Sequence, residues 1–274
     1  MDAKNRNLAV RLTTAALFLP LILFSLYRGG GWTGALLGAS AAMCAFEYYG
    51  LVWGKPRLPT WLGAALAASF PVCTALGWQR TGDFGFWSLL VFAMFCWIYF
   101  LFRGPREVGP AHVGHALTGV IYGGAGIAAL AGLRALPQGF TWVMAALTVT
   151  WLNDTTAYFV GRKFGRVKLL PEVSPNKTRE GFIGGLLGSV VGMFGVRWVF
   201  PGLLTPLDCL IVGLAGGVLG PLGDLCESML KRAYGAKDSG KMVPGHGGML
   251  DRVDALLFNA PMLYLYTHFI RGLL

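Results

Sequence analysis

Long apolar runs alternate with short polar segments along nearly the whole chain. A helix needs about 20 mostly apolar residues to cross the hydrocarbon core of a bilayer. Nine runs approach this requirement: residues 10–27, 32–53, 60–78, 86–102, 113–133, 140–160, 181–200, 207–229 and 253–272. The pattern therefore predicts an all-α, polytopic membrane protein with about nine transmembrane helices.

Composition favours a membrane protein and excludes several other classes. Of the 274 residues, 55% are hydrophobic and 13% are charged, whereas a soluble domain carries about 25% charged residues. The 40 glycines suit close packing of helices in lipid, where small residues let two backbones approach each other. These values exclude a disordered chain and a collagen. They also argue against a soluble globular enzyme, which needs a more polar surface.

The basic residues predict the orientation of the helices. If the N-terminus is cytoplasmic, 18 of the 23 lysines and arginines fall in cytoplasmic segments and 5 fall on the other side. This bias agrees with the positive-inside rule. We therefore expect a cytoplasmic N-terminus and a multi-pass protein. The compact chain, without soluble extensions, suggests the inner (plasma) membrane of a bacterium.

Two polar segments differ from the other connections in length and composition. Residues 161–180 and 230–252 hold 11 of the 23 basic residues, mixed with acidic residues, Ser, Asn and His. Topology alone does not require such a mixture, so both are expected to be functional cytoplasmic loops. We therefore divide the chain into N-terminal transmembrane helices at 1–139, with about five spans, and a C-terminal catalytic transmembrane region at 140–274.

The acidic residues gather in the second half of the chain. Nine of the 13 lie between Asp154 and Asp254. A carboxylate in lipid is costly and usually faces a polar cavity or an ionic partner. Spacings of i, i+3, i+4 and i+7 place four polar residues on one helix face: Asp224, Glu227, Ser228 and Lys231. The end of the eighth run is therefore expected to present a polar stripe at the cytoplasmic boundary.

Residues 231–254 combine a glycine-rich turn with charges of both signs. Gly245, Gly247 and Gly248 let the backbone approach a ligand, and a helix that begins nearby directs amide N–H groups toward an anion. Cations for phosphate groups are supplied by Lys231, Arg232, Lys237, Lys241 and Arg252. Hard oxygen ligands suited to Mg²⁺ are supplied by Asp224, Asp238, Asp251 and Asp254. This combination favours metal-assisted phosphoryl or nucleotidyl transfer.

The stretch S-M-L-K-R-A-Y-G-A-K-D-S-G-K-M-V-P-G-H-G-G-M-L-D-R-V-D, residues 228–254, closely resembles the signature of phosphatidate cytidylyltransferases, also called CDP-diacylglycerol synthases. A second part of the chain is also similar to this family: N-D-T-T-A-Y-F-V-G-R-K-F-G-R at 153–166, followed by S-P-N-K-T-R-E-G at 174–181. The resemblance covers roughly the last 120 residues. It implies transfer of CMP from CTP to phosphatidic acid, giving CDP-diacylglycerol and pyrophosphate in phospholipid biosynthesis.

The resemblance also implies roles for single residues. Asp224 and Asp251 are the first candidates for Mg²⁺ ligands, and Asp238 and Asp254 are further ligands or orienting groups. Together with His246, a candidate phosphate contact or proton donor, they form the expected catalytic set. Substrate-binding roles in the signature are expected for Ser228, Lys231, Arg232, Lys237 and Arg252. The family further suggests a homodimer, and a second cation beside Mg²⁺ is compatible with it.

Other polar positions complete the expected site. Asp154 and Asn153 form a polar notch in the sixth run, and Asp154 is expected to line the cavity, with a helix-packing role as the alternative. A compact polar loop is expected to bind the phosphates of CTP or lipid: Ser174, Asn176, Lys177, Thr178 and Arg179. Glu47, in the second run, matches no motif, and ion pairing and a functional role are equally open for it.

Two other functions fit part of the pattern. A related CTP-dependent membrane enzyme would be a lipid-alcohol kinase or a cytidylyltransferase for another lipid phosphate, and the signature argues against the kinase. An ion-coupled transporter also uses carboxylates within the membrane, but the acidic residues here gather at one membrane face and no internal repeat is present. The expected partners are CTP, phosphatidic acid and membrane lipids, with no nucleic acid.

Overall fold

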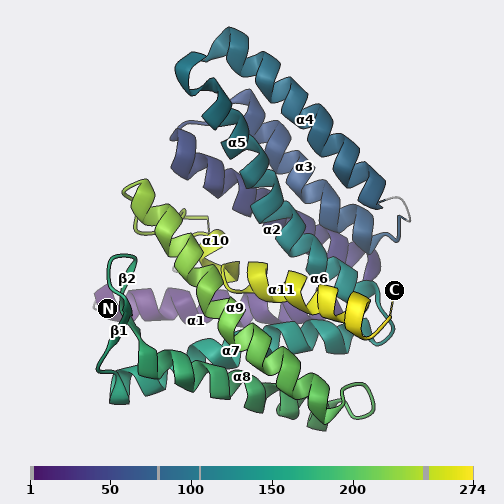
Figure 1. The fold of residues 1–274 in the computed structure, drawn as a ribbon, viewed down its shortest axis with the longest axis vertical. Coiled ribbons are helices and arrows are strands. Elements are labelled where there is room, and N and C mark those ends of the chain that lie inside the picture. The colour runs from purple at the N-terminus through teal and green to yellow at the C-terminus, as the bar shows by residue number, and fades with distance from the viewer. Residues whose placement is uncertain (1–2, 79–80, 105, 243–246, 274) are drawn as a thin grey trace. The chain divides into compact units, whose positions relative to one another are not determined.

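In a computed structural model, the chain is almost entirely helical (Figure 1). The structure describes residues 3–78, 81–104, 106–242 and 247–273, with side chains from residue 16 onward except at residue 81. The described residues form two compact units. One contains residues 1–135 and 236–252, and the other contains residues 136–235 and 253–274. The predicted functional division into 1–139 and 140–274 stays a prediction.

The first unit is a group of helices with one π-helical interruption. Its elements are α1 (Ala3–Arg28), α2 (Gly30–Trp53), α3 (Leu58–Ala75), α4 (Thr81–Arg103), the 3-10 turn η1 (Arg106–Val108), α5 (Gly109–Val120), the π-helix η2 (Ile121–Ala125) and α6 (Gly126–Ala135). Residues 236–252, here called the signature loop, complete this unit. The loop leads into the short helix α10 (Leu250–Val253), where the chain passes back to the second unit.

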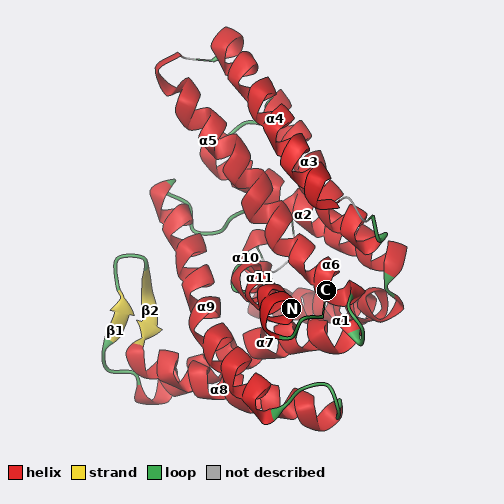
Figure 2. Ribbon diagram, turned by 45° about the vertical axis from the view of Figure 1, so that its right-hand side comes forward, coloured by secondary structure: helices red, strands yellow, loops and turns green. Residues whose placement is uncertain are grey.

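The second unit contains the remaining helices and a hairpin. Its elements are α7 (Gly139–Phe164), β1 (Lys168–Leu170), β2 (Ser174–Thr178), α8 (Arg179–Val199), α9 (Pro206–Ala233), α11 (Leu256–Leu265) and the π-helix η3 (Tyr266–Ile270). The two strands run antiparallel (Figure 2). Lys168 lies opposite Thr178, and Leu170 lies opposite Ser174. The sequence predicts a polar loop at 161–180 and no strands, so this hairpin is an addition to the all-α architecture.

Six helices in the described residues are long and apolar enough to cross a membrane. They are Gly30–Trp53, Leu58–Ala75, Gly82–Arg103, Arg106–Ala135, Arg179–Val199 and Pro206–Ala233. The all-α, polytopic membrane class is therefore confirmed, and the count of nine spans stays a prediction. The other three expected spans, at 10–27, 140–160 and 253–272, correspond to α1, to α7 and to α11 with η3, which form helices but do not belong to these six.

Arg134, in α6, connects the end of this helix to the end of α1. Its guanidinium donates to the carbonyl oxygens of Leu26 and Tyr27, which lie in the last turn of α1. The last carbonyls of a helix have no partner within the helix, so a cation there satisfies them and complements the helix dipole. Gly29 follows with φ +74°, and a Cβ there would lie 2.8 Å from Arg134. The positive φ favours glycine at this position, and the missing side chain leaves room for the Arg134 guanidinium.

A stripe of glycines on α8 allows it to lie against α7. Gly181, Gly184, Gly185 and Gly188 are all buried. A Cβ at Gly181 would lie 2.9 Å from the carbonyl oxygen of Ala157, and one at Gly188 would lie 2.1 Å from the Thr156 hydroxyl. Small residues at this spacing bring two helix backbones into close packing, as in membrane helix pairs. The expected role of the glycines in helix packing therefore applies to α7 and α8.

Asn153 compensates for a proline inside α9. Pro221 has no backbone N–H, so the carbonyl oxygen of Gly217, four residues earlier, loses its usual helical donor. The Asn153 side chain donates to that oxygen at 3.1 Å and to the Ser189 hydroxyl at 3.0 Å. Asn153 is only 1% exposed. Of the two residues in the predicted notch, Asn153 therefore has the helix-packing role.

Candidate functional site

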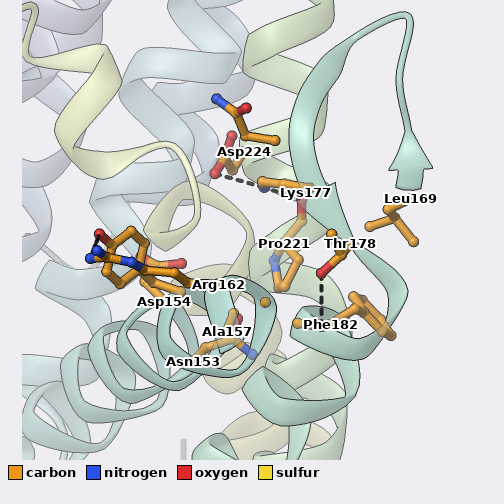
Figure 3. A pocket seen from close by; sticks show the side chains of 14 residues that line it. Asn153, Asp154, Ala157, Arg162, Leu169, Lys177, Thr178, Phe182, Pro221 and Asp224 are labelled. Carbon is orange, nitrogen blue, oxygen red and sulfur yellow. Dashed lines mark hydrogen bonds and ion pairs between the residues drawn. The ribbon is translucent and has the colours of Figure 1, made fainter. Parts of the chain in front are cut away.

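The second unit contains a cavity of about 500 Å³ formed by α7, the hairpin, α8 and α9. Predicted site residues in its lining are Asp154, Asn176, Lys177, Thr178 and Asp224. Figure 3 shows Asp154 on α7, Lys177 after the hairpin bend, and Asp224 on α9, all directed toward the same space. Ligand cavities of roughly 300–1,000 Å³ are usual for small molecules. The cavity is therefore large enough for part of a nucleotide or a lipid headgroup.

The central polar contact in the cavity is an ion pair between Lys177 and Asp224. The Lys177 ammonium lies 2.7 Å from an Asp224 carboxylate oxygen, and both side chains are about a quarter exposed. The same ammonium donates to the carbonyl oxygen of Pro221 at 3.4 Å (Figure 3). A candidate phosphate-binding cation and a candidate metal ligand are thus held together on two different elements.

Local sequence explains why Lys177 reaches the cavity. Thr178 is the N-cap of α8, and its hydroxyl accepts a hydrogen bond from the Gly181 amide at 3.1 Å, which fixes the start of the helix. Glu180, in the first turn, accepts hydrogen bonds from the amides of Arg166 and Val167. These contacts anchor both ends of the hairpin. Lys177 is the last residue before the cap and is therefore held at the cavity wall.

Three carboxylates of the second unit influence one another electrostatically. The negative charges of Asp224 and Asp154 disfavour ionisation of the Asp254 carboxyl group, and the positive charge of Lys177 favours it. Asp254 lies in the turn before α11, where one of its oxygens accepts a hydrogen bond from the Ala255 amide at 2.7 Å. The apolar run at 253–272 predicts that Asp254 lies in a continuous final helix. The structure instead has a turn between α10 and α11, so Asp254 is a turn residue.

The oxygen donors of this unit fit Mg²⁺ in type. Among the described residues, no group of three or more His, Cys, Asp or Glu side chains forms a ready metal cage. Mg²⁺ is usually held by one or two carboxylates together with substrate phosphates, and it rarely has a cage made only of protein groups. Carboxylates such as Asp224, which lines the cavity, and Asp254 therefore suit a metal that arrives with a nucleotide.

The signature loop in the first unit orients Asp251. One carboxylate oxygen of Asp251 accepts hydrogen bonds from the Ser239 amide at 3.0 Å, the Ser239 hydroxyl at 2.9 Å and the Gly248 amide at 2.9 Å. Around it, Lys237, Asp238 and Arg252 are exposed. His246 lies outside the described residues. The loop thus presents an oriented carboxylate with exposed charged neighbours.

The remaining predicted residues of the second unit lie at the end of α9 and around the hairpin. The Ser228 hydroxyl contacts Asp224 at 3.3 Å, and Lys231 forms an ion pair with the fully buried Glu227. Arg232 and Arg179 are exposed, and Ser174 begins β2. The predicted polar stripe is therefore a helical face, because α9 continues to Ala233. The substrate-binding roles of these residues stay predictions.

Two residues with clear structural roles were not among the predicted site residues. Arg162 lines the cavity, with a guanidinium nitrogen 3.2 Å from the Tyr158 hydroxyl. Asp154, Tyr158 and Arg162 are spaced by four residues and share one face of α7, so helical spacing was a usable signal. Glu47 accepts hydrogen bonds from the signature loop. Local sequence contains no signal for that contact.

The known proteins that are similar to this chain are cytidylyltransferases. The model of the cytidylyltransferase family matches residues 9–270. The phosphatidate cytidylyltransferase of Bacillus subtilis (strain 168) is 47% identical over 133 residues, which cover 48% of this chain and 49% of that protein. The phosphatidate cytidylyltransferase of Thermotoga maritima is 46% identical over 134 residues, 47% of this chain and 50% of that protein.

The phosphatidate cytidylyltransferase of Brucella abortus biovar 1 is 43% identical over 157 residues, 56% of this chain and 57% of that protein. These matches span about half the length of the curated relatives. The family match, in contrast, extends through the helices of both units. The chain therefore belongs to the cytidylyltransferase family.

Proposed function

We propose that this protein transfers CMP from CTP to phosphatidic acid, forming CDP-diacylglycerol and pyrophosphate for phospholipid biosynthesis. The observation that carries the proposal is the Lys177–Asp224 pair in a cavity beside two further carboxylates, Asp154 and Asp254. The relatives described above have the name of this activity. Their similarity covers about half of each protein, so the activity of this chain requires a direct test.

The reaction joins two anions. A phosphate oxygen of phosphatidic acid attacks the α-phosphorus of CTP, a new P–O bond forms, and the bond between the α-phosphorus and the bridging oxygen of the β-phosphate breaks. The electron pair of that bond leaves with pyrophosphate. A phosphate monoester is already ionised near neutral pH, since its second pKa is about 6. No strong general base is needed, and the main barrier is repulsion between the reactants.

Cationic side chains would relieve this repulsion. Lys177 and Arg162 both line the cavity and would bind the phosphates of CTP or of the lipid. A fixed cation stabilises charge more strongly in a partly dry cavity than in water. Lys177 would exchange its contact with Asp224 for a contact with a phosphate, which frees the Asp224 carboxylate.

Asp224 and Asp254, with Asp251 of the signature loop, are the candidate Mg²⁺ ligands. Bound Mg²⁺ would neutralise the triphosphate and stabilise the departing pyrophosphate. The carboxylates would orient the nucleotide through the ion, and the lysine and arginine side chains would hold the remaining phosphate oxygens. A second cation is compatible with this charge distribution.

The test is an assay of purified protein in detergent with CTP, phosphatidic acid and Mg²⁺. Label from [α-³²P]CTP should enter the lipid product, and label from [γ-³²P]CTP should appear in pyrophosphate. Excess EDTA should abolish transfer, and added Mg²⁺ should restore it. Lipid labelling from the γ position alone would instead indicate a CTP-dependent lipid kinase. Substrate uptake into sealed vesicles without CTP consumption would indicate a transporter.

We also propose on which side of the membrane the site lies. CTP is a cytosolic solute and phosphatidic acid is a membrane lipid, so the site is proposed to face the cytoplasm at the inner membrane, in a homodimer. In a cysteine-free variant, a cysteine introduced at the exposed Glu172 should react with an impermeant maleimide in inverted vesicles and not in intact cells. The opposite labelling pattern would reverse the orientation. Native mass spectrometry would give the oligomeric state.

A further inference from the structure

Glu47 is a buried acidic residue inside a membrane-spanning helix. It lies in α2 and is 4% exposed. An ionised carboxylate in a medium of low dielectric constant is costly unless strong donors surround it. The contacts of Glu47 should therefore indicate what its carboxylate does.

Every partner that the described part of the chain gives this carboxylate is a neutral donor from the signature loop. Oε1 accepts a hydrogen bond from the Met249 amide at 2.9 Å. Oε2 accepts from the Leu250 amide at 2.9 Å and lies 3.1 Å from the Ser239 hydroxyl. Ser239 lies in the first part of the loop, at 236–242, and Met249 and Leu250 lie in the last part, at 247–252. We call these two parts the arms of the loop. One carboxylate thus joins the two arms.

Two glycines of the loop make this arrangement possible. A Cβ at Gly240 would lie 2.5 Å from Oε1 of Glu47, and a Cβ at Gly248 would lie 2.5 Å from Oε2. Any side chain at either position would displace the carboxylate. From the sequence, Gly248 is expected to let the backbone approach a ligand. The structure shows that it admits the side chain of Glu47, a residue of the same chain.

The same contacts extend to Asp251. The Ser239 hydroxyl lies between the two carboxylates, 3.1 Å from Glu47 and 2.9 Å from Asp251. The Gly248 amide donates a hydrogen bond to Asp251. The next amide, that of Met249, donates a hydrogen bond to Glu47. Three consecutive amides, at residues 248–250, therefore donate first to Asp251 and then twice to Glu47. A shift of the loop relative to Glu47 would move the donors that orient Asp251.

We infer that Glu47 is a positioning residue: it holds the two arms of the signature loop together and thereby orients Asp251. A carboxylate suits this role because it has acceptor sites on both oxygens and has no donor of its own. Bonds from N–H groups to a charged acceptor are stronger than bonds between neutral groups. The part of this inference that concerns catalysis rests on the proposed function, in which Asp251 binds Mg²⁺.

Hydrogen exchange of the full chain in detergent micelles tests the arrangement without catalysis. Glu47→Gln keeps the size of the side chain but turns one oxygen into an NH₂ donor, so at least one loop donor loses its acceptor. We expect the amides of Met249 and Leu250 to exchange roughly tenfold faster or more, and peptides from α7 and α8 to keep their rates. Unchanged exchange in folded Glu47→Gln protein would overturn the inference.

Tyr49→Phe is the matched control. Tyr49 lies on the same helix, is 1% exposed, and donates to the Ala116 carbonyl oxygen at 2.6 Å. Its substitution removes a buried hydrogen bond of α2 away from the loop and should leave loop exchange unchanged. If Glu47→Gln does not fold, Ser239→Ala provides the test. It removes only the hydroxyl between the two carboxylates and should raise loop exchange about fivefold, and no change would count against the inference.

The second readout is the Mg²⁺ concentration that gives half-maximal CMP transfer. We expect Glu47→Gln to raise it roughly tenfold, and Tyr49→Phe to leave it unchanged. An active Glu47→Gln protein with the wild-type Mg²⁺ requirement would overturn the link to Asp251. A wild-type chain that transfers no CMP would contradict the proposed function, whereas faster loop exchange in Glu47→Gln would still support the role of Glu47 in holding the loop.

Discussion

The Lys177 ammonium and the Asp224 carboxylate, which both line the cavity of the second unit, lie 2.7 Å apart. Lys177 is the second-last residue of β2, and Asp224 lies near the cytoplasmic end predicted for α9. The pair therefore joins the segment that we expect to bind phosphate to the segment that we expect to bind metal. Its substitution should affect catalysis more than folding, because both side chains are partly exposed and exposed ion pairs contribute little to stability.

Lys177→Ala should lower CMP transfer by roughly a hundredfold or more, the range seen when a preorganised charge-stabilising group is removed. Lys168→Ala is the matched control, because Lys168 is an exposed lysine of the same hairpin and does not line the cavity. Both variants should elute as monodisperse protein in size-exclusion chromatography. Equal loss in the two variants would show that hairpin charge in general matters and that Lys177 has no special role.

Asp251→Asn should abolish detectable transfer with little loss of folded protein, because it removes a negative charge from the expected metal site. Glu172→Gln removes a charge from the exposed bend of the hairpin and should leave transfer unchanged. The measurement is the rate of label transfer from [α-³²P]CTP per folded protein. Near-normal turnover of purified Asp251→Asn would remove Asp251 from the candidate metal ligands.

Arg162→Ala should lower kcat/KM for CTP or for phosphatidic acid roughly tenfold, because it removes a cavity cation that neutralises phosphate charge. Lys163→Ala is the control, since Lys163 is an exposed neighbour on α7 that does not line the cavity. Steady-state kinetics with each substrate varied in turn will show which phosphate Arg162 binds. Wild-type kinetics for both substrates would exclude a binding role.

Asn153→Ala should destabilise the second unit by about 1 kcal/mol, the usual size of a side-chain hydrogen bond between membrane helices. The substitution leaves the Gly217 carbonyl oxygen without the Asn153 donor. Thr155→Ala, at an exposed position on α7, should leave stability unchanged. Thermal melting in detergent, followed by size-exclusion chromatography, measures the difference. Equal melting temperatures would mean that another donor satisfies Gly217.

Hydrophobic periodicity predicted the membrane class and the approximate places of the helices, because burial in lipid requires continuous apolar runs. It was less informative for α7, where Asn153, Asp154 and Arg162 interrupt the apolar run. These polar residues are the ones that build the cavity and its packing. Of the helices that line the cavity, α7 is thus the one that departs most from the simple pattern.

Only part of the candidate site could be predicted from the sequence. Lys177 and Asp224 could be proposed because they belong to recognisable motifs, and the structure brings them into contact. The hairpin was missed because its short strands contain Pro, Asn and Lys, which are uncommon in strands. The role of Glu47 was missed because its partner Ser239 is 192 residues away in the chain, and no local pattern reports a contact at that separation.

The acceptor for the Met249 and Leu250 amides comes from α2, far upstream of the motif it supports. A recombinant fragment limited to residues 140–274 would contain every motif that resembles the family, yet it would leave these two backbone donors without the Glu47 carboxylate. Grafting the motif into a different scaffold would have the same defect. A chimera that contains this segment must therefore also contain an acidic side chain from outside it.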